Sequence, residues 1–153
     1  MKVTFICVGS ARGSLADAIQ DYEVRVGRYF DFGNIEAAAG KGTQERVREF
    51  EGKRILDRLP AGCRVYALTR DGDRCTSRRL AVQLEELALY GPPCAAFVIG
   101  GAFGLDDRVR EAADTALTLS DLTLPHDLAR LVLLEQLYRA GTILRREPYH
   151  KGG

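Results

Sequence analysis

The stretch CAAFVIGG, residues 94–101, is a continuous apolar segment that ends in two glycines. A run of this kind lacks the polar alternation of a half-exposed strand. It is typical of a strand buried on both faces of a parallel sheet. Two prolines precede the segment and two glycines end it, so the sequence indicates where the strand begins and ends. The segment therefore predicts a parallel sheet with helices packed on both faces.

Strand and helix patterns alternate along the rest of the chain. Apolar and β-branched runs predict further strands at 2–9, 34–39, 64–69 and 115–120. Helical spacing predicts helices at 14–30, 43–59, 77–90, 106–113 and 126–146, with Ser14 as a cap and a turn at 70–73. Strands and helices that alternate in this way predict an α/β fold, and residues 1–153 are expected to form a single domain.

The composition is that of a globular protein without a strong charge bias. Apolar residues make up 46% of the chain, charged residues 28%, and the formal net charge is +1. No apolar run reaches membrane-spanning length and no signal segment opens the chain, so a cytoplasmic location is expected. The four cysteines include no CxxC pair and there are only two histidines, which argues against a metal site and favours reduced thiols.

The segment FICVGSARGS (5–14) resembles the phosphate loop of the low-molecular-weight tyrosine phosphatases. That loop needs five residues between a nucleophilic cysteine and an arginine, whereas four separate Cys7 from Arg12. Gly13 stands where a serine or threonine is required, and the chain has no Asp-Pro pair to supply a general acid. We therefore expect Cys7 to be a packing residue at the end of a strand.

The first candidate binding segment is VIGGAFGL (98–105), which overlaps the end of the buried strand. Its glycines, Gly100, Gly101 and Gly104, allow a ligand to approach bare backbone, although a tight strand-to-helix turn accounts for them equally well. The spacing is not the dinucleotide-binding GxGxxG, and no P-loop lysine follows. Ligands of open parallel sheets bind at the carboxyl ends of the strands, where this segment lies.

The second candidate segment is LSDLTLPHDLARLVLLEQLYRA (119–140). Its helix carries consecutive apolar residues at 131–134, so apolar side chains point to all sides. A helix at the end of a small domain cannot bury every side in its own core, which predicts burial against a second subunit. Arg130 and Arg139 also lie in this helix. Buried arginines have anionic partners, which are either structural carboxylates or a ligand.

These segments, with KVTFICVG at the start (2–9) and EPYHK near the end (147–151), resemble the bacterial pseudouridine-N3 methyltransferases of large-subunit ribosomal RNA. That family, ribosomal RNA large subunit methyltransferase H, belongs to the SPOUT superfamily. The resemblance runs from end to end at matching length. The combination of LTLPH, LEQLYRA and a terminal YHK is highly specific.

The resemblance implies a SPOUT-type α/β fold of about five mainly parallel strands, with a C-terminal trefoil knot. It implies a homodimer, consistent with the over-apolar helix, and S-adenosylmethionine as the cofactor, lodged in the knot. The family's cofactor contacts carry over to Leu68, Gly101, Ser120, Asp121, Leu122, Thr123, Leu124 and Pro125. The backbone of these segments suits an adenine held by main-chain hydrogen bonds.

The implied reaction is methyl transfer to N3 of a pseudouridine in the large-subunit RNA of the assembled ribosome. Recognition of a large particle reconciles a nearly neutral chain with an RNA substrate. Tyr149 and His150 match the family's terminal Tyr-His and are the expected catalytic residues. Arg139 is expected to stabilise the anionic base or contact a phosphate, unless it forms an internal salt bridge. His126 is expected to cap its helix or serve the dimer.

One residue departs from the family pattern. Phe103 stands where the glycine loop of the family often has an acidic residue, so no carboxylate role is transferred to it, and stacking on a base is expected instead. The alternative function is a non-catalytic ribosome-binding factor of the same dimeric fold. The intact cofactor and tail motifs argue against that alternative.

Overall fold

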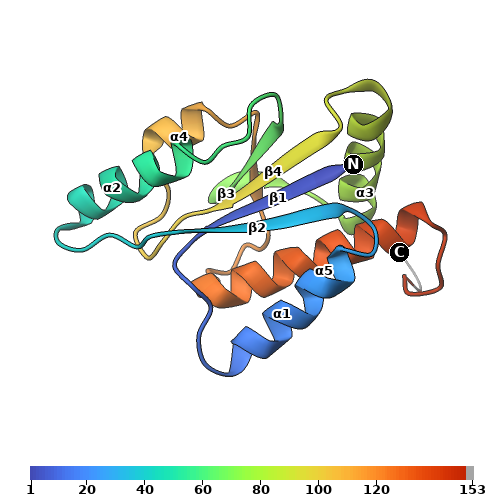
Figure 1. Ribbon diagram of the computed structural model, residues 1–153, viewed down its shortest axis with the longest axis horizontal. Helices are drawn as coiled ribbons and strands as arrows, with labels where there is room; N and C mark the ends of the chain where they lie inside the picture. The colour runs from blue at the N-terminus through green and yellow to red at the C-terminus, as the bar shows by residue number, and fades with distance from the viewer. Residues whose placement is uncertain (151–153) are drawn as a thin grey trace.

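The computed structural model describes residues 1–150, and residues 151–153, including the last residue of the YHK motif, lie outside the described residues. A five-stranded sheet with the order β2-β1-β4-β3-β5 forms the centre of the molecule (Figure 1). The strands are β1 (Lys2–Val8), β2 (Asp31–Ala37), β3 (Arg64–Arg74), β4 (Cys94–Ile99) and β5 (Thr115–Thr118). Every neighbouring pair is parallel, which confirms the predicted α/β sheet.

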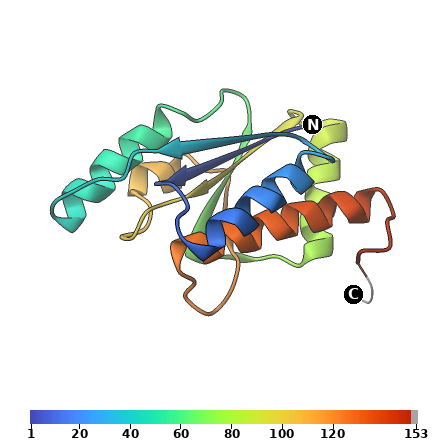
Figure 2. The ribbon, with the colours of Figure 1, turned by 60° about the horizontal axis from the view of Figure 1, so that its bottom comes forward.

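Helices cover both faces of the sheet, as predicted (Figures 1 and 2). One face carries α1 (Ser14–Val26), α3 (Ser77–Tyr90) and α5 (His126–Leu144). The opposite face carries α2 (Gln44–Leu56) and the short α4 (Asp107–Glu111). No helix within residues 1–150 is long and apolar enough to cross a membrane.

The apolar run that opened the sequence analysis supplies side chains to both cores. In β4, Phe97 packs beneath α1, α3 and α5, whereas Val98 packs beneath α2 and α4. Both side chains are fully buried. β1 alternates in the same way, with Phe5 in the first core and Ile6 in the second. The absence of polar alternation in these strands is therefore explained by helices on both sides.

Side-chain caps fix the starts of three helices. Thr43, Thr76 and Asp106 each accept a hydrogen bond from a backbone N–H in the first turn of α2, α3 and α4. Such caps satisfy donors that have no partner within the helix. The expected cap at Ser14 is wrong, because Gly13 occupies the N-cap position and no side chain bonds there. The first two predicted helices also end three or four residues early, at Val26 and Leu56.

The predicted turn at 70–73 is also wrong. β3 continues through these residues to Arg74, with a register shift against β5 between Leu68 and Asp73. A Cβ on Gly72 would lie 2.6 Å from the backbone of Leu117, so only glycine allows the two strands to approach this closely. The turn-forming residues therefore mark an irregularity within a strand.

The cysteines follow the predictions only in part. Cys7 is fully buried, and burial raises the pKa of its thiol to about 12, so it is packing and not a nucleophile. Cys63 and Cys94 form a disulfide with a Cα–Cα distance of 4.7 Å, which contradicts the expectation that all four thiols are reduced. The pair joins the segment before β3 to the start of β4.

Candidate active site

A cavity of about 1180 Å³ lies at the carboxyl edge of the sheet, and we call it the carboxyl-edge cavity. The predicted cofactor residues that line it are Leu68, Gly101, Ser120, Leu122, Thr123, Leu124 and Pro125. Asp121 does not line it and instead pairs with Arg74 at 2.8 Å. The structure therefore brings together all but one of these residues. Their role as cofactor contacts stays a prediction.

Short-range hydrogen bonds shape the loop between β5 and α5. The Ser120 hydroxyl accepts a hydrogen bond from the backbone N–H of Leu122 at 2.9 Å. The Thr118 hydroxyl donates to the Ser120 carbonyl at 3.0 Å. Pro125 is the N-cap of α5 and turns the chain into the helix. Because side chains already satisfy part of this loop, the remaining backbone groups are free to face a ligand.

The glycine loop forms the opposite wall of the cavity. The N–H of Gly104 donates to the carbonyl of Gly101 at 3.0 Å, and Gly104 has a φ of +78° that favours glycine. A Cβ on Gly100 would lie 2.8 Å from the backbone of Gly104. Phe103 and Leu122 line the cavity with exposed side chains, 44% and 77% accessible. An apolar lip therefore borders the cavity.

Sequence reasoning missed one residue beside this loop, Glu51. It lies in α2, which reads as a highly charged, solvated helix, yet its side chain is only 4% accessible. Its Oε1 accepts a hydrogen bond from the backbone N–H of Gly40 at 3.0 Å, whereas Oε2 is buried and has no hydrogen-bond partner within residues 1–150. A Cβ on Gly101 would lie 2.5 Å from that oxygen, so the carboxylate packs directly against the glycine loop.

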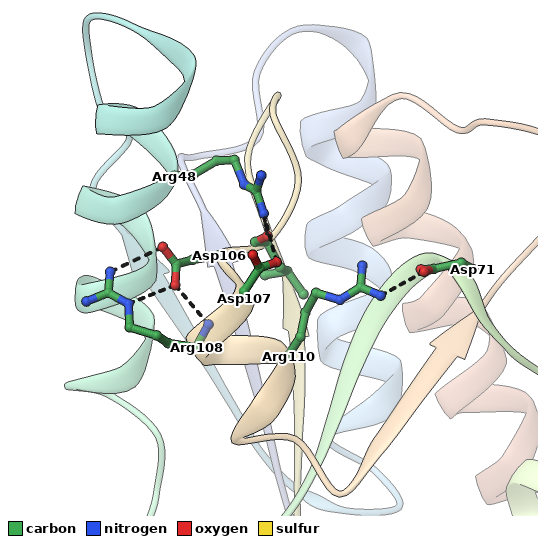
Figure 3. Close-up of polar contacts among 7 residues, drawn as sticks. Arg48, Asp71, Asp106, Asp107, Arg108 and Arg110 are labelled. Carbon is green, nitrogen blue, oxygen red and sulfur yellow. Dashed lines mark hydrogen bonds and ion pairs between the residues drawn. The ribbon is translucent and has the colours of Figure 1, made fainter.

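Arginine–aspartate pairs surround the cavity on the side of α2 and α4 (Figure 3). Arg48 bonds to Asp107 at 3.1 Å and to the carbonyl of Leu105 at 2.9 Å. Arg110 pairs with Asp71 at 2.7 Å and lowers the pKa of that carboxyl. A further pair joins Arg108 to Asp106 at 2.8 Å. Arg48 and Arg110 are therefore compensated within the protein, whereas Arg70, which also lines the cavity, is exposed and forms no ion pair within residues 1–150.

The three predicted catalytic residues form one cluster with Glu135, which we call the tail cluster. Glu135 Oε1 accepts hydrogen bonds from Arg139 Nε at 3.0 Å and from the Tyr149 hydroxyl at 3.2 Å. His150 Nδ1 lies 3.3 Å from Arg139, and the guanidinium lies over the Tyr149 ring. Hydrogen bonding with Tyr22, burial and the Glu135 charge raise the pKa of Tyr149, so its phenol stays protonated at neutral pH.

The tail cluster packs on the second half of α5, whereas the carboxyl-edge cavity lies at the first turn of that helix. His126 and Ala129, in the first turn of the helix, line the cavity, whereas the tail follows its last turn. The helix has 19 residues. At the usual rise per residue, Glu135 and Arg139 lie about 9 and 15 Å along the axis beyond Ala129. No residue of the tail cluster lines the cavity. The predicted catalytic residues and the predicted cofactor residues therefore do not meet within one chain.

Comparisons with known proteins fit this geometry. A family model described as "Predicted SPOUT methyltransferase" matches residues 1–150. A protein of Syntrophotalea carbinolica named "Ribosomal RNA large subunit methyltransferase H" is 44% identical over 98% of this chain and 99% of its own. A protein of the same name from Rubrobacter xylanophilus is 48% identical over 97% of this chain and 98% of its own. The chain belongs to the SPOUT methyltransferase family.

Solved structures agree with this SPOUT methyltransferase in fold. The crystal structure of a "probable methyltransferase" from Bordetella pertussis aligns with a TM-score of 0.55 at 15% identity. It covers 92% of this chain and 94% of that chain. At this identity the likeness concerns the fold alone. The trefoil knot implied by the resemblance stays a prediction.

Two further candidates in this SPOUT methyltransferase have structural explanations. Arg130 is 2% accessible and pairs with Glu23 at 2.9 Å and Glu36 at 3.1 Å, so its anionic partners are structural. His126 forms no side-chain cap, contrary to one expectation, and its Nδ1 lies 3.3 Å from Asp127. Its Nε2 is buried without a hydrogen-bond partner among the described residues. No cluster of potential metal ligands occurs in residues 1–150.

Proposed function

We propose that this protein transfers a methyl group from S-adenosylmethionine to N3 of a pseudouridine in large-subunit ribosomal RNA. The observation that carries the proposal is full-length membership in a family whose curated relatives are named ribosomal RNA large subunit methyltransferases. The convergence of the motif residues on one cavity supports it. Because the substrate is the ribosome, we place the protein in the cytoplasm.

The carboxyl-edge cavity fits the cofactor in size and chemistry. Its volume of about 1180 Å³ exceeds what a nucleoside with an amino-acid tail requires. Leu68 and the 120–125 loop would hold the adenosine part through their backbone, and Gly101 would meet the methionyl part. The unpartnered Oε2 of Glu51 behind Gly101 suits a positively charged ligand. S-adenosylmethionine supplies an electrophilic methyl group on a sulfonium.

The proposed active site requires a homodimer. No residue of the tail cluster lines the cavity of its own chain, so a second copy would bring its tail to the first copy's cavity. Val132 supports α5 as the contact surface. It is partly exposed and belongs to neither core cluster, whereas its neighbours Leu133 and Leu134 are fully buried in the chain's own core. The apolar surface of α5 that its own chain leaves uncovered is thus small and lies around Val132.

The tail residues would prepare the base for methylation. N3 of a pseudouridine carries a proton, and its lone pair is delocalised until that proton leaves. Arg139 stays charged beside Glu135 and would stabilise the resulting anion. The protonated phenol of Tyr149 cannot take the proton in this arrangement, and would stack or donate a hydrogen bond. His150, next to Arg139, is left as the group that accepts the proton.

The rim of the cavity suits an RNA held mainly by the shape of a particle. Phe103 and Leu122 present apolar surface on which a splayed base can pack. Arg48 and Arg110 are paired with aspartates, so among the arginines that line the cavity only Arg70 forms no ion pair within residues 1–150, and one free charge gives little affinity for naked RNA. These features support the assembled ribosome as the substrate.

The proposal is tested by following labelled methyl groups from S-adenosylmethionine into RNA. The substrates are assembled ribosomes, isolated large subunits and free large-subunit RNA, all from cells that lack the protein. We expect transfer to assembled ribosomes, and a large loss of rate in His150→Ala with an unchanged affinity for the cofactor. An Arg54→Ala variant on the distant face of α2 serves as the control. Ribosome binding without any methyl transfer would instead identify a non-catalytic ribosome-binding factor.

A further inference from the structure

Glu51 is a buried acid to which no specific partner has been assigned above. Of the residues described, it is the one buried carboxylate-bearing side chain, at 4% accessibility. One oxygen holds the N–H of Gly40, and the other has no hydrogen-bond partner within residues 1–150. Buried polar atoms in folded proteins are nearly always paired, so an orphaned carboxylate oxygen calls for an explanation. A positively charged ligand that binds nearby would explain it.

Glu51 has no cation as a salt-bridge partner. No ion pair reaches it from the described part of the chain. Arg48, one turn earlier in α2, bonds to the Leu105 carbonyl and to Asp107 through Nη2, and its Nε is buried without a partner among the described residues. A buried carboxylate without a cation is costly, and the cost falls when a positive charge arrives. The buried Glu51 carboxylate therefore favours the binding of a positively charged group nearby.

The position of Glu51 directs that preference towards the carboxyl-edge cavity. Its carboxylate lies directly behind Gly101, where a Cβ would lie 2.5 Å from Oε2 and 2.9 Å from Oε1. Gly101 itself lines the cavity. A ligand that touches the backbone of Gly101 is thus separated from the carboxylate by a single residue without a side chain. A side chain at this position would force the Glu51 carboxylate to shift.

We propose that Glu51 is the counter-charge for the ammonium group at the methionyl end of the cofactor. The proposal rests on the proposed function, in which S-adenosylmethionine occupies this cavity. The carboxylate selects ligands that carry the amino-acid tail, whether or not the sulfur is charged. Its hydrogen bond to Gly40 fixes one carboxylate oxygen before the ligand arrives, and Glu51 does not itself line the cavity, so its charge acts across the backbone of Gly101.

The test uses calorimetry with three ligands that differ in charge. S-adenosylmethionine carries the sulfonium and an amino-acid tail with its ammonium and carboxylate, S-adenosylhomocysteine carries the same tail without the sulfonium, and 5′-methylthioadenosine carries neither the tail nor the sulfonium. Glu51→Gln keeps the shape and the acceptor for Gly40 but removes the charge. We expect it to weaken the first two ligands by a similar factor of about ten to a hundred and to leave the third unchanged. Glu49→Gln, an exposed position on the same helix, is the matched control.

Each other outcome has a defined meaning. Equal affinities of wild type and Glu51→Gln for all three ligands overturn the proposal. A loss for S-adenosylmethionine alone shows that the sulfonium is recognised, and an equal loss for all three shows a structural role, so both also overturn it. If Glu51→Gln does not fold, Glu51→Asp must still prefer the ligands that carry the ammonium. A wild-type protein that binds none of the three refutes the proposed function itself.

Discussion

The separation of the tail cluster from the cavity predicts that two defective chains can repair one another. One variant, Gly101→Val, disrupts the glycine loop, because its Cβ would collide with Glu51. The other, Tyr149→Ala with His150→Ala, loses the tail side chains but keeps the cavity. Neither homodimer should transfer methyl groups. A mixed dimer should regain activity, since the tail cluster packs on the second half of α5 and contributes no residue to the cavity of its own chain.

The expected activity follows from the symmetry of the dimer. In a mixed dimer, one site combines the intact cavity of one chain with the intact tail of the other. The second site combines both lesions and is inactive. Purified mixed dimers should therefore show about half the wild-type rate per dimer. A dimer of wild type with a chain that carries both lesions gives the opposite result, because each of its sites then contains one lesion.

The assay needs two affinity tags so that mixed dimers can be purified after coexpression. Methyl transfer to assembled ribosomes is then measured for both kinds of mixed dimer. If the tail acts on the cavity of its own chain, the first kind will be inactive and the second kind will retain about half the activity. That reversal would refute the inference that each tail acts in the cavity of the partner, and with it the composite site.

Further predictions concern stability, assembly and titration. Leu134→Ala should lower the free energy of unfolding in urea by about 2–5 kcal/mol, because this side chain is fully buried; a loss below about 1 kcal/mol would contradict its place in the core. Val132→Asp should leave the chain folded by circular dichroism but monomeric in sedimentation and inactive. Cys7 should react with a thiol reagent at pH 8 only after unfolding, since burial raises its pKa to about 12. The hydrogen bond from Ser10 lowers the pKa of Glu36 in the folded protein, so its contribution to stability is complete above the unfolded pKa and is lost as the pH falls. Glu36→Gln should therefore flatten the decline in melting temperature between about pH 5 and pH 3, and a decline as steep as that of wild type would show that Glu36 does not contribute.

The layers of the fold could be predicted because the strongest patterns reflect burial on both faces. The run from Cys94 to Ile99 has no polar alternation, and its side chains do enter two separate cores. Local chemistry was less reliable. The residues at 70–73 have turn propensity, but pairing with β5 keeps them in β3. Ser14 has the chemistry of a cap, but Gly13 takes that position. In both places tertiary contacts outweigh local preference.

The site was predictable as a set of segments but not as an arrangement. The motifs around Gly101 and Ser120 meet at one cavity because parallel strands end at the same edge of the sheet. The burial of Glu51 could not be predicted, because it lies in a helix of mostly charged residues. Its contact with Gly101 is seen only in the structure, where a Cβ on Gly101 would meet the Glu51 carboxylate. The distance of Tyr149 from the cavity was equally hidden, since it depends on the direction in which α5 leaves the cavity edge.

The central claim, methylation of a pseudouridine in large-subunit RNA, is tested most directly by mass spectrometry of that RNA. Nucleosides are compared from cells with the gene intact, with it deleted, and with it restored as wild type or as His150→Ala. The account predicts that a methylated pseudouridine is lost on deletion, returns with the wild-type chain and does not return with His150→Ala. An unchanged content of methylated pseudouridine in the deletion strain would contradict it.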